Sequence, residues 1–298
     1  MIVNMPKAKA NGLELEYEII GEGEPLVLIM GIGAQLIYWR DEFCERLAAE
    51  GFTIVRFDNR DVGLSTKLDG QKAPAFAELV SRGVLGLPIA APYDLADMAD
   101  DTAGLLDALG FSRAHVVGAS MGGMIAQTMA ITHPHRVASL CSIMSNPGGR
   151  RHLLSAPKAM RALLQPTPRN RAEAVDRAEG FYAVCGSTGF PRDVEAIRER
   201  AGRAYDRCHY PQGFLRHMAA IFATGSRREA LKFVRAPTAV IHGSADPLIL
   251  PSGGRATAAA IPGSRLHVVD GMGHDLPEGA WPQIIETISS NARRAAAS

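Results

Sequence analysis

A serine between two glycines is the strongest chemical signal in this sequence. Ser120 stands in Gly118-Ala119-Ser120-Met121-Gly122, directly after a short apolar run at residues 114–117 and before a predicted helix over residues 121–133. A strand-to-helix turn forces such a serine into a strained conformation that projects its side chain, and the flanking positions need glycine because neighbouring chain approaches closely. The free N–H groups at the start of the helix favour negative charge there. Ser120 is therefore the predicted nucleophile.

A serine hydroxyl needs a base to remove its proton, and His274 is the predicted base. It follows the last apolar run, and loops at the carboxyl ends of parallel strands gather where Ser120 also points. Five other histidines, in strand runs or at a helix end, are more typical of structural positions: His115, His133, His135, His242 and His267. The last three lie in a long insertion and are more typical of solvated helix faces than of substrate contacts: His152, His209 and His217.

Asp246 is the predicted acid that orients the base. It lies in the loop after the apolar run at residues 238–242, at the same edge of the sheet as His274. The loop after the preceding strand, residues 145–148, offers no acid. Asp275 is adjacent to the histidine, where its geometry for reaching the far ring nitrogen would be poor.

Two backbone N–H groups are predicted to stabilise the oxyanion of an acyl-transfer intermediate. One belongs to Met121, the residue after the nucleophile. The other comes from the glycine-rich loop after the run at residues 25–30, where we assign the Ile32 N–H and keep that of Gly33 as the alternative. Removing one such donor typically costs about 3 kcal/mol of transition-state stabilisation.

Short apolar runs alternate with helical patterns along most of the chain. The runs, typical of strands covered on both faces, lie at residues 25–30, 53–57, 114–117, 140–144, 238–242 and 266–269. The helical patterns lie at residues 39–50, 95–109 (with Asp94 as N-cap), 121–133, 252–261 and 283–294. Residues 13–19 alternate apolar with acidic residues, which predicts a half-exposed strand at a sheet edge. The predicted fold class is therefore α/β, with a doubly wound, mostly parallel sheet.

Residues 146–235 interrupt this alternation with helical patterns and no good strand, which predicts a helical insertion over one edge of the sheet. The insertion carries 17 Lys and Arg against 8 Asp and Glu, whereas the rest of the chain carries 15 against 23. The positive electrostatic field of this insertion could steer anionic substrates towards the protein or favour binding to anionic membrane surfaces. Interleaved Arg and Glu at residues 192–200 are more typical of an exposed helix with paired charges.

Composition excludes several other classes of protein. The chain has 298 residues, 47% hydrophobic, with a formal net charge of +1, so it can bury a large core and lacks the basic excess of a nucleic-acid binder. Its four cysteines form no CxxC pair, which gives a metal site no support. Neither a signal peptide nor an apolar run of about 18 residues is evident, and we expect a cytoplasmic protein without a membrane span.

The rather apolar stretch of residues 67–92 is long for a connection between two elements. It predicts a short helical segment beside the pocket or a homo-oligomer contact.

Together these motifs resemble the α/β-hydrolase superfamily over nearly the whole chain. Residues 57–65 are similar to the family's Asp-x-Arg-Gly-x-Gly-x-Ser loop, with Asp61 where glycine is usual, and the order Ser, Asp, His is the family's order. The family's bacterial aclacinomycin methylesterase-type branch is similar in two motifs. They are Met30-Gly31-Ile32-Gly33, where His-Gly is commoner in the family, and Asn59-Arg60-Asp61-Val62-Gly63.

The resemblance implies a core domain of residues 1–145 and 236–298 and a helical cap domain, residues 146–235, between strands 6 and 7. It also implies ester hydrolysis without a cofactor. We expect Asp58, Arg60 and Asp61 to hold loops together.

The substrate pocket is expected to be apolar and suited to esters with hydrophobic groups. Its predicted walls come from the glycine-rich loop after residues 25–30 (the first loop), the strand ends, the loops that carry Asp246 and His274, and the insertion. These wall residues are Gly31, Gly33, Gln35, Met144, Leu248, Met272, Phe214 and Met218. The alternative for the aromatic residues of the insertion is that they only hold its helices together.

The sequence therefore predicts a serine carboxylesterase that acts on a small-molecule ester through an acyl-enzyme. An amidase or aminopeptidase and a C–C bond hydrolase remain open, because they share the triad. Haloalkane dehalogenase chemistry is excluded, because it needs an aspartate where Ser120 stands. A non-catalytic ligand-binding receptor on the same scaffold is the alternative from another class.

Overall fold

An eight-stranded sheet forms the centre of the molecule in this computed structural model, which describes residues 6–149 and 155–296. The strand order is β1-β2-β4-β3-β5-β6-β7-β8; β1 and β2 are antiparallel to their neighbours, and the other pairs are parallel. The bounds are β1 (Lys7–Ala10), β2 (Leu13–Ile20), β3 (Glu24–Ile29), β4 (Phe52–Phe57), β5 (Ala114–Ala119), β6 (Val137–Ile143), β7 (Thr238–Gly243) and β8 (Arg265–Val269). The predicted doubly wound, mostly parallel sheet is confirmed.

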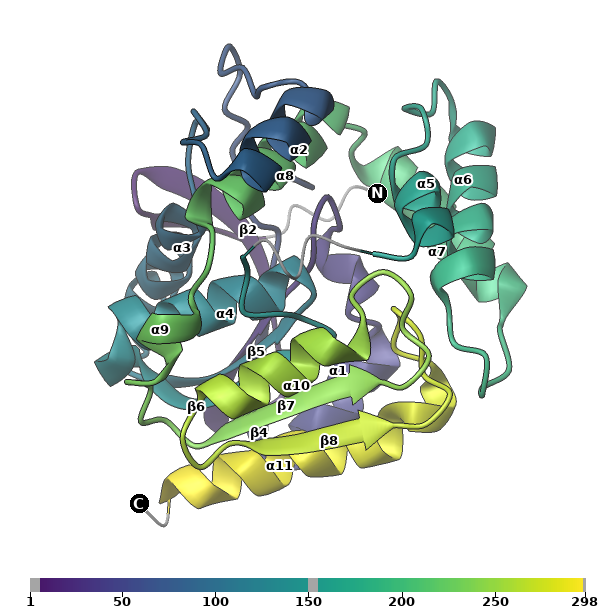
Figure 1. Cartoon of the computed structure of the whole chain (residues 1–298). Coiled ribbons are helices and arrows are strands. Elements are labelled where there is room, and N and C mark those ends of the chain that lie inside the picture. The colour runs from purple at the N-terminus through teal and green to yellow at the C-terminus, as the bar shows by residue number, and fades with distance from the viewer. Residues whose placement is uncertain (1–5, 150–154, 297–298) are drawn as a thin grey trace.

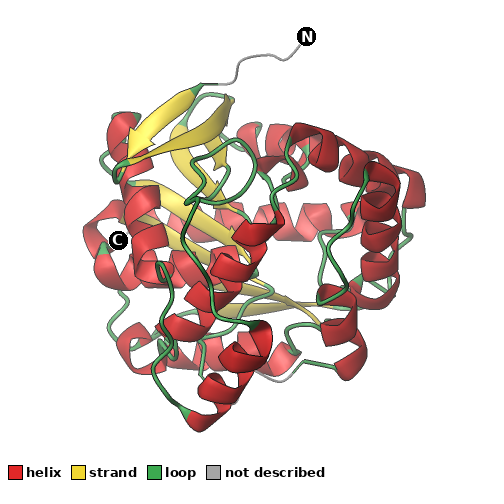
Figure 2. Ribbon diagram, turned by 90° about the horizontal axis from the view of Figure 1, so that it is seen from above, coloured by secondary structure: helices red, strands yellow, loops and turns green. Residues whose placement is uncertain are grey.

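Helices cover both faces of the sheet (Figures 1 and 2). One face carries α1 (Asp41–Ala48) and α11 (Trp281–Ala296), and the other carries α3 (Leu95–Ala108), α4 (Met121–Thr132) and α10 (Pro251–Ala260). Short 3-10 turns are η1 (Leu36–Tyr38), η2 (Pro134–Arg136) and η4 (Glu278–Ala280). Each face has its own apolar core because the central strands are buried on both sides.

The helix boundaries follow local chemistry. Asp94 caps α3 as predicted: its side chain accepts hydrogen bonds from the N–H groups of Ala96 and Asp97, and the Asp97 side chain accepts from the Asp94 N–H. This reciprocal pair satisfies three donors that a helix start leaves free. Helix α4 ends before Pro134, which cannot donate to the helix, and the observed end is Thr132.

Both edges of the sheet differ from the sequence expectation. Residues 13–19 were expected at an edge, but β2 pairs with both β1 and β4, and β1 is the edge strand. The four residues of β1 are too short and lysine-rich to stand out in the sequence, and only Ala8 and Ala10 are buried. The expectation that β8 is covered on both faces is also wrong, because it forms the other edge and exposes Leu266 and Val268.

Among the described residues between β6 and β7 there are five helices and no strand. They are α5 (Pro157–Leu163), α6 (Arg171–Cys185), α7 (Val194–Arg207), α8 (Pro211–Thr224) and α9 (Arg228–Leu231). Helices α5, α6 and α7 pack together, whereas α8 packs against α2 (Phe76–Leu85) and α3 (Figure 1). The stretch at residues 67–92 therefore does contain a short helix, and Phe76 lines the main cavity.

Candidate active site

Ser120 occupies the sharp turn between β5 and α4. Its φ and ψ are 57° and −119°, a strained conformation for a residue with a side chain. A Cβ on Gly118 would lie 2.1 Å from the Gly122 carbonyl oxygen, and one on Gly122 would lie 2.0 Å from the Ile29 carbonyl oxygen. Both positions therefore require glycine so that β3, β5 and α4 can approach one another.

Three side chains from distant parts of the chain form a continuous hydrogen-bonded series. His274 Nε2 lies 3.0 Å from Ser120 Oγ, and His274 Nδ1 lies 2.8 Å from Asp246 Oδ2. The other carboxylate oxygen of Asp246 accepts hydrogen bonds from the N–H groups of Leu248 and Ile249. Asp246 is buried, and His274 is 9% exposed. In this arrangement the carboxylate holds the Nδ1 hydrogen and leaves Nε2 free to accept the proton of the serine.

The loop that carries His274 is fastened to the end of α6. The His274 N–H donates to the Cys185 carbonyl at 2.6 Å, and the Gly273 N–H donates to Ser187 Oγ at 2.9 Å. Asp275 points away from the triad, because it accepts from both the N–H and the hydroxyl of Ser187. Burial raises the pKa of Asp275, and the bonds from Ser187 partly offset that effect.

The two expected oxyanion donors lie near Ser120. Within residues 6–149 and 155–296, the N–H groups of Met121 and Ile32 donate no hydrogen bond. The alternative donor, the Gly33 N–H, is engaged by His217 Nδ1 at 3.2 Å. A Cβ on Gly31 would lie 3.2 Å from Ser120 Cβ, so the first loop passes directly over the serine.

His217 is the histidine whose position sequence reasoning predicted wrongly. It is fully buried on α8, not on a solvated helix face, and its Nε2 donates to the Arg60 carbonyl at 2.7 Å. Small residues at Gly213 and Ala220 flank it at helical spacing and are also buried. This spacing of small residues was the sequence signal that this face of the helix is buried against neighbouring segments of the protein.

The loop at residues 57–65 is held by buried ion pairs. Asp58 accepts from the Leu36 N–H at 2.7 Å and from Arg207 Nη1 at 2.6 Å. Arg60 pairs with Asp101 on α3, and Asp61 pairs with Arg216 on α8 at 2.7 Å. Burial alone would raise the pKa of Asp61, but hydrogen bonds from Arg216, the Leu68 N–H and Tyr93 lower it below its ordinary value. These three side chains thus tie loops and helices together.

A cavity of about 940 Å³ opens onto Ser120 and His274. Six of the expected wall residues line it: Gly31, Gly33, Gln35, Met144, Leu248 and Phe214. Two do not: Met272 is fully buried in the core against α11, and Met218 packs against Leu79 on α2. The backbone turn at Gly271, with φ of 68°, precedes Met272, whose side chain lies in the core and not in the cavity.

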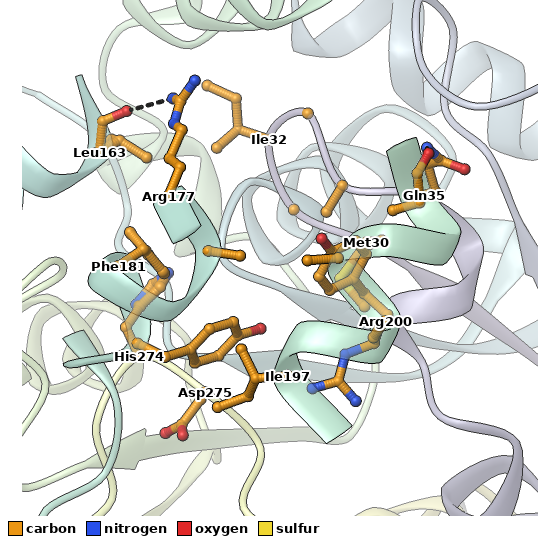
Figure 3. A pocket seen from close by; sticks show the side chains of 18 of the residues that line it. Met30, Ile32, Gln35, Leu163, Arg177, Phe181, Ile197, Arg200, His274 and Asp275 are labelled. Carbon is orange, nitrogen blue, oxygen red and sulfur yellow. Dashed lines mark hydrogen bonds between the residues drawn. The ribbon is translucent and has the colours of Figure 1, made fainter. Parts of the chain in front are cut away.

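The insertion supplies much of the cavity wall, partly through residues that sequence reasoning did not single out. Helices α6 and α7 contribute Arg177, Ile197 and Arg200, which the sequence did not point to, and Phe181, one of the aromatic residues expected as possible wall (Figure 3). Arg177 donates to the Leu163 carbonyl at 3.0 Å, and burial lowers its pKa. The wall is therefore mostly apolar with a few guanidinium groups.

Neither a metal cluster nor a membrane helix is found in the part of the chain that the structure describes. No group of three or more His, Cys, Asp or Glu there could hold a metal ion. No helix there is long and apolar enough to cross a bilayer.

Comparisons with known proteins agree with this architecture. Residues 24–279 match the family described as alpha/beta hydrolase fold. Rhodomycin D methylesterase DauP of Streptomyces sp. (strain C5) is 29% identical over 298 residues, covering 91% of each chain. The 2-hydroxy-6-oxononadienedioate/2-hydroxy-6-oxononatrienedioate hydrolase 2 of Pseudomonas putida is 27% identical, covering 88% of this chain and 85% of the relative. The crystal structure of the enol-lactonase from Burkholderia xenovorans LB400 superposes with a TM-score of 0.71 at 21% identity, covering 98% of this chain and 100% of that one.

Proposed function

The chain belongs to the alpha/beta hydrolase fold family, and from that premise we propose that this hydrolase is a serine carboxylesterase working through an acyl-enzyme. The observation that carries the proposal is the series Ser120 Oγ, His274 and Asp246, with contacts of 3.0 and 2.8 Å. The similarity to a methylesterase over 91% of both chains supports an ester as the substrate.

The first half-reaction forms the acyl-enzyme. Ser120 Oγ attacks the ester carbonyl carbon while His274 Nε2 takes the hydroxyl proton, and Asp246 stabilises the resulting imidazolium. The N–H groups of Met121 and Ile32 hold the oxyanion, and the start of α4 adds its positive end. When the tetrahedral intermediate collapses, the carbon–oxygen bond to the alcohol breaks, and the alcohol leaves with the proton from His274.

The second half-reaction returns the enzyme to its starting state. A water molecule gives one proton to His274 Nε2 and attacks the acyl carbon. The new intermediate collapses, the bond to Ser120 breaks, and the serine recovers its proton while the carboxylic acid departs. No redox partner is required, because each step moves only protons and acyl groups.

We also propose that residues 146–235 form a cap domain over a core of residues 1–145 and 236–298. The support is that α5, α6, α7 and α8 all contribute to the wall of the cavity that holds Ser120. This mainly apolar wall suits esters of small molecules with hydrophobic acyl or alkoxy groups.

The test is a panel of p-nitrophenyl esters of increasing acyl length, run on the wild type and on Ser120→Ala. Ser120→Ala should abolish turnover and labelling by a fluorophosphonate probe while the protein stays folded. Ser145→Ala is the matched control, because this buried hydroxyl makes no hydrogen bond within the described residues. Activity of Ser120→Ala close to that of the wild type would overturn the proposal.

Cleavage of a carbon–carbon bond is the second candidate, because the Pseudomonas putida relative is a dienedioate hydrolase. A dienone-carboxylate panel beside the ester panel separates the two reactions. Turnover of these compounds at a higher kcat/KM than any ester would favour the second candidate.

A further inference from the structure

His217 connects helix α8 to two loops on either side of the imidazole ring. Its Nδ1 lies 3.2 Å from the Gly33 backbone nitrogen, and its Nε2 lies 2.7 Å from the Arg60 carbonyl oxygen. Gly33 stands 184 residues before it in the sequence. The ring of Tyr93 meets the imidazole edge-on, with ring centroids 6.3 Å apart. The imidazole thus fills a specific place in the interior.

The two hydrogen bonds determine the protonation state of the ring. Gly33 N–H is a donor, so Nδ1 must carry a lone pair, and the carbonyl of Arg60 requires the hydrogen on Nε2. Burial lowers the pKa of His217 to about 4, although the Arg60 carbonyl and Asp61 favour the charged form. The neighbouring charges, Arg60 and Asp61, are themselves paired with Asp101 and Arg216. His217 is therefore a neutral imidazole with one fixed tautomer.

The contact with Gly33 fixes the loop that carries the expected oxyanion donor. Gly33 has φ of 63°, and a Cβ there would lie 3.1 Å from the Phe214 ring on α8. On its other side the loop passes over Ser120 at Gly31. The loop is thus held between α8 and the nucleophile, with the Gly33 N–H occupied and the Ile32 N–H making no hydrogen bond to any residue that the structure describes.

We propose that His217 is a positioning residue that sets the oxyanion loop for catalysis through its bond to the Gly33 N–H. The inference rests on the proposed esterase function and assigns a catalytic task to a helix of the insertion. His217 touches neither the substrate nor the reacting atoms. Its effect is to keep the Ile32 N–H directed at the oxyanion, which develops only in the transition state.

Two substitutions separate the two hydrogen bonds. His217→Asn places an amide oxygen near the position of Nδ1 and keeps an acceptor for the Gly33 N–H. His217→Gln places an amide nitrogen near Nε2 and keeps the donor to the Arg60 carbonyl but not that acceptor. Loss of a whole oxyanion donor costs about 10²–10³ in kcat, so misplacing the loop should cost roughly 10- to 100-fold. We therefore expect kcat of His217→Gln to fall by that factor with KM nearly unchanged, and kcat of His217→Asn to stay within about threefold of the wild type.

A transition-state analogue distinguishes positioning from a merely structural role. A trifluoromethyl ketone adds to the serine oxygen and places an oxyanion in the same site. Its inhibition constant should rise in His217→Gln by the same factor by which kcat falls. Active-site titration with a fluorophosphonate normalises each rate to folded protein. Tyr93→Phe is the matched control, because it removes a buried hydrogen bond to Asp61, 2.7 Å long, but makes no change at Gly33 or in its bond to His217.

The outcomes are distinct. The inference fails if His217→Gln keeps kcat and analogue affinity within threefold of the wild type, or if His217→Asn or Tyr93→Phe loses as much as His217→Gln. If instead the wild type hydrolyses no ester and the probe does not label Ser120, the proposed function fails, and the inference falls with it.

Discussion

The carboxylate of Asp246 and the imidazole of His274 are joined at 2.8 Å, and the second oxygen of Asp246 is occupied by two backbone N–H groups. The carboxylate therefore presents one oxygen to the ring in a fixed direction. His242 also lies near it, 3.6 Å away, but its Nε2 donates to the Ile249 carbonyl at 2.7 Å. Of the two histidines, only His274 connects Asp246 to Ser120.

The first prediction concerns this contact. Asp246→Asn should lower kcat by about 10⁴-fold, because an amide can donate to Nδ1 and stabilise the tautomer that cannot accept the serine proton. The measurement is p-nitrophenyl ester turnover together with circular dichroism. Asp270→Asn, on the neighbouring exposed loop, is the control and should keep its activity. Equal activities of the two variants would contradict the assigned role of Asp246.

The second prediction tests the close approach at the nucleophile turn. Gly122→Ala should destabilise the protein by about 3 kcal/mol, since the added Cβ would lie 2.0 Å from the backbone oxygen of Ile29. Gly180→Ala, in helix α6, meets nothing closer than 3.9 Å and should stabilise by up to about 1 kcal/mol. Urea unfolding of both variants checks the contrast, and a Gly122→Ala protein with wild-type stability would refute it.

The third prediction is a pH dependence of stability that originates at His217. The folded protein keeps this imidazole neutral down to pH about 4, whereas the unfolded chain binds the proton at the ordinary value of 6.5. The unfolded state therefore binds more protons between these values, and stability is lost as pH falls from 6.5 to 4, by up to about 3 kcal/mol. His217→Asn removes the group, so urea unfolding between pH 4.5 and 7.5 should show a flatter profile for the variant. Parallel profiles would exclude His217 as the source.

The fourth prediction compares a buried with an exposed ion pair. Arg216→Met should cost about 3–5 kcal/mol, because it leaves the carboxylate of Asp61 buried without its cation. Arg169→Met breaks the exposed pair with Glu173 and should leave the urea midpoint unchanged. Similar losses in both variants would show that the link between α8 and the 57–65 loop contributes no special stability.

Much of the fold could be predicted because its signals are local. A strand buried on both faces is mostly apolar, and the turn at Ser120 needs glycine at positions 118 and 122 because neighbouring backbone lies within 2.1 Å of where a Cβ would be; both requirements are written in consecutive residues. The capping of α3 by Asp94 is equally local. Such features depend on a few neighbouring residues, so the sequence alone determined the alternation of strands and helices and the turn that carries the serine.

Contacts between distant segments could not be predicted in the same way. The Gly33 N–H is engaged by His217, whose position is fixed by the packing of α8 against Gly33 and the 57–65 loop. The pairing of β1 at the edge and the burial of Met272 and Met218 likewise depend on which surfaces meet. The local sequence pattern shows that a side chain can be buried. Only the tertiary structure decides which side chains it packs against, because the packing energy depends on the shapes of the two surfaces that meet.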